Sequence, residues 1–137
     1  RLPKPDRRPV MTQTASRWVR PAAIAAGIFG ALTLLSGGLA LFGPKAAQDA
    51  AGNAVPFVLV FNFSAGFAYL IGAVALWLNH PAARTIAWLI ALSTLSVFAA
   101  FLWAVFGGTP YEIRTVGAMT VRAGFWLAIA ILLGQVR

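Results

Sequence analysis

The sequence predicts an all-α fold, namely an integral membrane antiparallel four-helix bundle with its N- and C-termini cytoplasmic. The chain is 60% hydrophobic and only 10% charged, with a mean hydropathy of +0.80, whereas soluble domains carry about 25% charged residues. Its apolar residues fall in four long runs rather than in amphipathic stripes, which is typical of transmembrane helices. The runs are joined by short polar segments, so neighbouring helices should be antiparallel.

The chain divides into a tail and one domain. Residues 1–17 are basic and proline-rich, and we expect them to be disordered, whereas residues 18–137 should form the transmembrane domain. The predicted spans are about 21–42, 55–78, 85–106 and 113–133. Met11 could be a natural translation start, which would make residues 1–10 an extension. A cleaved signal peptide is the alternative for the first run, but this run is longer than the roughly 7–15 apolar residues of such signals.

The first two runs carry helix-start and packing signals. Pro21 and Pro56 stand at their beginnings, where the missing N–H of proline costs little. In the first run, Ala26 and Gly30 belong to a set of small residues spaced every four positions, which lets helices approach closely in lipid. In the second run, Asn62 and a tyrosine seven residues later share one helix face. We expect that face to point into the bundle.

The later connections are two turns. Residues 79–81 (Asn-His-Pro) and 107–111 (Gly-Gly-Thr-Pro-Tyr) predict tight turns on either side of the third run. Residues 43–54, between the first two runs, are expected to form a polar loop.

Charge distribution predicts the orientation. With the N-terminus inside, the inner side receives the six cations that precede the first run, together with Arg84 and Arg137, whereas the outer side receives Lys45 and Arg114. A basic segment beside a span contacts anionic lipid, so the net charge of +8 does not indicate nucleic acid. Arginine exceeds lysine and alanine is abundant, which favours a bacterial inner membrane.

Arg122 is the one charged residue that falls deep inside a predicted span, since Arg114 stands at the outer end of the fourth. A charge in this position marks a candidate functional site, because burying it in lipid is expensive. It follows Arg114 by eight residues, or about 12 Å of helix. The predicted ligand-binding layer comprises Arg122, Asn62, Ser36, Ser96 and Tyr69. Such a layer could bind the oxygen-rich head of a lipid, a quinone or an anion, because a guanidinium presents five donors.

Two structural interpretations of Arg122 compete with ligand binding. It could satisfy backbone carbonyls and Asn62 and so fix the helix register. Alternatively, the fourth span could start late, so that Arg122 marks its outer interface; residues 123–136 would then cover only about 21 Å of a roughly 30 Å hydrocarbon core. Tyr111, Glu112 and Arg114 are expected to form an exposed outer-rim cluster, which, if functional, would control access to the polar layer.

The residue types exclude several kinds of chemistry. With no cysteine, two methionines and a single histidine, His80, the chain is not expected to hold a metal or a cofactor. No acidic residue or histidine lies within a span, which disfavours proton-coupled transport. The membrane-embedded glutamate of small multidrug transporters and the in-span histidines of b561-like cytochromes are therefore absent as well.

These observations predict a small non-catalytic membrane protein, an accessory or scaffold subunit of a larger membrane complex. The alternative is a binder or transporter of a small lipophilic or anionic ligand at the layer around Arg122 and Asn62; an enzyme ranks third. The expected partners are membrane lipids and other membrane subunits or further copies of the chain, because a thin bundle buries little surface by itself.

Overall fold

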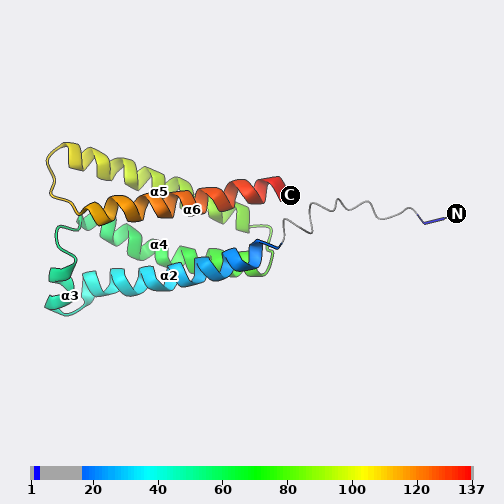
Figure 1. Ribbon diagram of the computed structural model, residues 1–137, viewed down its shortest axis with the longest axis horizontal. Coiled ribbons are helices and arrows are strands. Elements are labelled where there is room, and N and C mark those ends of the chain that lie inside the picture. The colour runs from blue at the N-terminus through cyan, green and yellow to red at the C-terminus, as the bar shows by residue number, and fades with distance from the viewer. Residues whose placement is uncertain (1, 4–16, 137) are drawn as a thin grey trace.

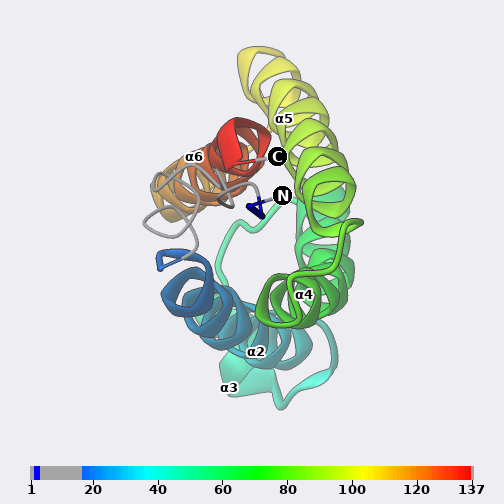
Figure 2. The same ribbon diagram turned by 90° about the vertical axis from the view of Figure 1, so that its right-hand side faces the viewer.

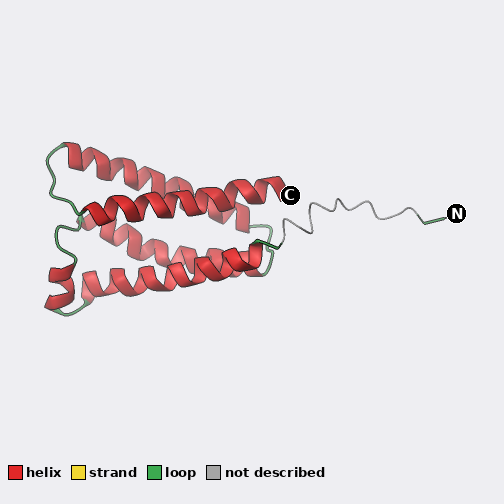
Figure 3. Cartoon of the chain, viewed as in Figure 1, coloured by secondary structure: helices red, strands yellow, loops and turns green. Residues whose placement is uncertain are grey.

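The computed structural model describes residues 2–3 and 17–136. Within these residues it is entirely helical, with no strand (Figure 3). The elements, labelled as in Figure 1, are α2 (Val19–Phe42), α3 (Lys45–Ala50), α4 (Pro56–Trp77), α5 (Ala83–Phe106) and α6 (Ile113–Val136). The prediction of an all-α chain with four long apolar helices is confirmed, and the predicted bounds differ from the observed ones by at most three residues. Most of the predicted tail, including Met11, lies outside the described residues.

The four long helices have the length and apolar composition needed to cross a membrane. The mean hydropathy of their best windows is between 1.9 and 2.2, and only 22–39% of each window is buried inside the protein. A helix that is apolar all round but mostly exposed cannot be a stable element of a water-soluble fold. The helices therefore identify an integral membrane protein.

The connection between α2 and α4 differs from the predicted polar loop. Lys45–Ala50 forms the short helix α3, which follows Pro44 and precedes Gly52, a residue at φ +63°. A six-residue helix leaves no periodic signal in a sequence, and its three alanines resemble an ordinary small-residue loop. The other two connections are turns, as predicted; Asn79 adopts φ +52° in the first and Gly108 φ +95° in the second.

The long helices pack in chain order. Helix α2 lies along α4, α5 lies along α6, and α4 and α5 join the two pairs (Figure 1). Viewed end-on, the helices follow an arc from α2 through α4 and α5 to α6 (Figure 2). Over the described residues, α2 and α6 make no extensive contact with each other. The first and last long helices therefore leave a seam between them.

Glycines set the close approach of α2 and α4. A Cβ atom on Gly30 would lie 3.1 Å from the Tyr69 Cβ, and one on Gly66 would lie 2.8 Å from the Leu34 Cγ. These distances leave no room for a side chain without a shift of the neighbouring helix. Small residues allow this approach in lipid, where helix association depends on packing rather than on hydrophobic burial.

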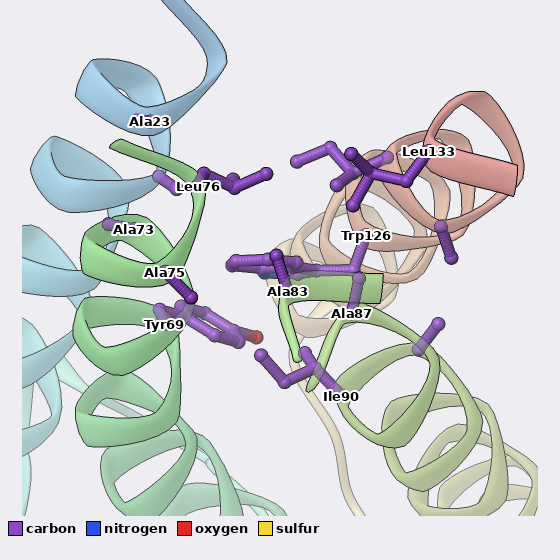
Figure 4. Packing of buried hydrophobic residues seen from close by; sticks show 14 of the residues in the cluster. Ala23, Tyr69, Ala73, Ala75, Leu76, Ala83, Ala87, Ile90, Trp126 and Leu133 are labelled. Carbon is purple, nitrogen blue, oxygen red and sulfur yellow. The ribbon is translucent and has the colours of Figure 1, made fainter. Parts of the chain in front are cut away.

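The interior has two clusters at opposite ends of the long helices. We call the part next to Val19, Trp77 and Ala83 the terminal half, and the part next to Phe42, Pro56 and Phe106 the α3 half. In the terminal half, residues of all four long helices pack around Tyr69 and Trp126 (Figure 4). In the α3 half, a smaller cluster joins α4, α5 and α6 only: Val55, Val58, Phe101 and Met119 are its buried members. Helix α2 contributes nothing to this second cluster among the residues described.

Candidate functional site

Arg122 lies within α6, nine residues after Ile113 and so about 14 Å from the start of the helix. Helix α6 is continuous through this position. The helix therefore begins well before Arg122, whereas the alternative in which the membrane span starts late, with Arg122 at its outer interface, stays a prediction. The side chain is half-buried, and its Nε and Nη1 atoms are buried with no hydrogen-bond partner in the described part of the chain.

A polar cavity of about 240 Å³ adjoins Arg122 in the α3 half. Since roughly 10–15 Å³ suffices for one water molecule, this space can hold a polar group together with several waters. The walls come from α2, α4, the segment after α3 and the first three turns of α6. They consist of Thr33, Ser36, Gly37, Ala51, Leu59, Asn62, Glu112, Arg114, Thr115, Ala118 and Arg122.

Asn62 and Ser36 lie where the predicted layer requires them. Both line the cavity with Arg122. The Asn62 Oδ1 is buried without a partner among the described residues, so Arg122 does not donate to it. The structural interpretation in which Arg122 donates a hydrogen bond to the Asn62 side-chain oxygen is therefore wrong. The Ser36 hydroxyl donates to the Thr33 carbonyl in its own helix at 3.4 Å and stays accessible from the cavity.

Ser96 does not join this group. Its side chain is exposed on α5, and its hydroxyl donates to the carbonyl of Leu92 at 2.8 Å. Thr94, two positions earlier, is the polar residue of α5 that faces the interior, with a fully buried side chain. The prediction that Ser96 belongs to the layer is wrong because it assumes a different rotation of α5 about its axis. An almost uniformly apolar helix gives little information on which face points inward.

Tyr69 lies deeper, in the terminal half. It is fully buried, and its ring packs on Phe29 and Trp126 at centroid distances of 5.6 and 5.4 Å. Neither its hydroxyl nor that of Thr94 has a hydrogen-bond partner among the described residues. Figure 4 shows the hydroxyl end of Tyr69 directed towards Ile90 of α5. Tyr69 therefore belongs to the core of the terminal half and is not among the residues that line the cavity.

The predicted rim residues attach α6 to the segment around α3. The backbone N–H of Asn53 donates to the Glu112 Oε1 at 2.9 Å, and the Arg114 Nη2 donates to the carbonyl of Ala50 at 3.1 Å. Glu112 and Arg114 also line the cavity, whereas Tyr111 packs edge-on against Phe101 at 6.1 Å. Glu112 keeps its negative charge while it accepts from the Asn53 backbone, so the cavity is lined by one carboxylate and two guanidiniums.

Sequence reasoning missed several residues of the site. Thr33 lines the cavity and is almost fully buried, and Phe29 lies beneath the guanidinium, whose Cζ is 5.8 Å from the ring centroid. Trp126 is the largest fully buried side chain, and its Nε1 has no partner among the described residues. A threonine in an apolar run could have been considered; the aromatic residues carried no distinguishing signal.

Chemically, the site offers hydrogen-bond donors around an otherwise apolar interior. Within the described residues, no group of three or more histidine, aspartate or glutamate side chains could hold a metal ion. No family model, curated protein or solved structure matches this chain. The functional argument therefore depends on the geometry of the site alone.

Proposed function

We propose that this integral membrane protein binds a small ligand with an anionic or oxygen-rich head in the cavity beside Arg122. The observation that carries the proposal is the half-buried Arg122 guanidinium: its Nε and Nη1 are buried with no partner in the described chain, and the same side chain lines a 240 Å³ cavity. A desolvated charge without a partner is unfavourable, and an oxygen anion that accepts from the guanidinium would offset that cost.

The charge balance of the cavity supports an anion. Its charged lining residues are Arg114, Arg122 and Glu112, which sum to one positive charge, and the carboxylate already accepts from the Asn53 backbone. Asn62 and Ser36 add groups able to donate to further oxygens. A cation would meet two guanidiniums in the same space.

The binding test uses purified protein in a neutral detergent and butyl phosphate as the probe. Arg122→Gln should weaken binding by about tenfold or more, because charge-assisted hydrogen bonds are lost. The affinity of Arg122→Lys should lie between those of the unmodified protein and Arg122→Gln, since lysine keeps the charge but not the two-donor fork. The matched control is Arg20→Gln, which removes the same charge from the surface beside Trp77 and should bind like the unmodified protein.

Stability without the probe separates this proposal from a purely structural role. If Arg122 fixes helix register, Arg122→Leu should lower the melting temperature. If it is a binding group, the same change removes an unfavourable buried charge, and the protein should melt at the same or a higher temperature. Wild-type affinity of Arg122→Lys, or equal losses in Arg122→Gln and Arg20→Gln, would contradict the binding proposal.

For the whole molecule, we keep the proposal of an antiparallel bundle with both termini cytoplasmic, in a bacterial inner membrane. The positive-inside distribution supports it. A reporter active only in the periplasm and fused after residue 137 should then be silent, and one inserted at Gln48 should be active. The accessory-subunit role stays a prediction from the sequence, because no contact in the described structure distinguishes a partner-binding face from a lipid-facing one.

A further inference from the structure

The seam between α2 and α6 carries a second cavity, a groove of about 330 Å³ on the outer side of α2. Six of its lining residues belong to α2 and one to α6: Phe29, Leu32, Thr33, Leu35, Ser36, Leu39 and Arg122. From Phe29 to Leu39 the groove follows about 15 Å of helix. Leu32 and Leu35 are more than half exposed, so this groove faces the surroundings of the bundle rather than its core.

The groove and the polar cavity meet at shared residues. Thr33, Ser36 and Arg122 line both. The α3 half thus contains a cavity lined mostly by polar residues and a groove lined mostly by apolar ones, with Arg122 at the junction. They meet where α2 and α6 make no extensive contact over the described residues (Figure 2).

A molecule that fills both the cavity and the groove must itself be amphipathic. Its head requires oxygen atoms that accept from Arg122, and its tail must be a narrow apolar chain, because the groove is formed by one helix and a single α6 side chain. Arg122 is the only charged residue among those that line the groove. Such a molecule resides in the bilayer and can reach the groove without crossing water.

We infer that the ligand is a single-chain membrane amphipath with an anionic oxygen headgroup, which enters sideways from the bilayer between α2 and α6. The head occupies the polar cavity beside Arg122, and the chain lies along Leu32, Leu35 and Leu39. This inference rests on the proposed binding function and adds the class of ligand and its direction of access. It also explains why the seam is open beside Arg122, the only charged residue of the four long helices that lies away from a helix end.

The test uses the full chain in phosphatidylcholine vesicles that contain a small fraction of a photoactivatable alkyl phosphate, with a diazirine at mid-chain. A phosphatidylcholine that carries the same diazirine reports non-specific lipid contact. Cross-linked positions are mapped by mass spectrometry. Cross-links of the alkyl phosphate should be enriched at Leu32, Leu35 and Leu39 over those of the choline lipid, by about tenfold, and Arg122→Gln should remove the enrichment.

A second pair of variants tests the groove independently of Arg122. Leu32→Trp should fill the groove and reduce the enrichment at Leu35 and Leu39. Leu92→Trp, on α5, is the matched control: Leu92 is 54% exposed against 57% for Leu32, and it should leave the pattern unchanged. If Arg122→Gln does not fold, Arg122→Lys replaces it, with a smaller expected loss.

The outcomes separate the two proposals. Uniform cross-linking around the bundle, while butyl phosphate still binds in an Arg122-dependent manner, would overturn lateral access and leave the binding function intact. Butyl phosphate binding that does not depend on Arg122 would overturn the binding function itself. Enrichment at the α2 groove that survives Arg122→Gln would overturn the headgroup assignment and show an apolar lipid contact only.

Discussion

The terminal half and the α3 half contain the same four long helices but fill the space between them differently. In the terminal half, small residues such as Ala26 and Ala87 bring the helices close, and Tyr69 and Trp126 fill the centre. In the α3 half, α2 stays out of the buried cluster, and a polar cavity occupies the space beside it. Stability should therefore depend mainly on the terminal half, and binding on the α3 half.

This division follows from packing in lipid. Because lipid tails are as apolar as leucine, helices associate through close fit rather than through burial of apolar surface. The α3 half lacks this close fit beside α2, so it gains little stability on that side and can accommodate another molecule instead. The comparison can be tested by changes that affect one half only.

The largest expected effect is that of Trp126→Ala. Trp126 is fully buried in the terminal half, and truncation should cost about 3 kcal/mol or more, near the low end for tryptophan in a core, because lipid weakens the transfer contribution. The matched control is Trp103→Ala, since Trp103 is 84% exposed and should cost little. Unfolding in detergent measures both, and similar losses for the two variants would contradict a core centred on Trp126.

An intermediate effect is expected where α2 and α4 approach. In Gly66→Ala, the new Cβ would lie 2.8 Å from the Leu34 Cγ, so overpacking should cost about 1–3 kcal/mol. The control is Gly117→Ala on α6, where a Cβ would meet nothing within 4 Å. This control should leave stability unchanged or raise it by up to about 1 kcal/mol, because alanine favours helix. Equal melting temperatures for both variants would argue against the close approach.

The smallest effect is expected at the rim. Glu112→Gln weakens the hydrogen bond from the Asn53 backbone, and for such an exposed contact we expect a global cost below about 1 kcal/mol. Locally, amide hydrogen exchange should accelerate at Asn53 and across residues 45–54. Asp49→Asn changes an exposed carboxylate in the same segment and serves as the control. Unchanged exchange at Asn53 in Glu112→Gln would show that this contact does not hold the segment.

The sequence predicted the four long helices because the requirement to span a hydrocarbon core leaves long apolar runs that depend little on tertiary contacts. It also identified Arg122 and Asn62, because polar groups are conspicuous within such runs. The same uniformity concealed the rotation of each helix about its axis, which is why Ser96 was placed inside instead of Thr94. The helix α3 is too short to leave a periodic signal, and the attachment of Glu112 to Asn53 joins residues distant in sequence, which a single chain does not reveal.

The open seam between α2 and α6 also bears on how the protein is made. Every extensive contact between long helices joins neighbours in the chain: α2 with α4, α4 with α5, and α5 with α6. Among the described residues, contacts between the first and last helices are few, such as that of Arg122 with Phe29, so little of the packing has to wait for the complete chain. Local contacts favour fast folding, and chains begin to fold from the N-terminus during synthesis. The α2–α4 hairpin can therefore form in the membrane while α5 and α6 are still being translated.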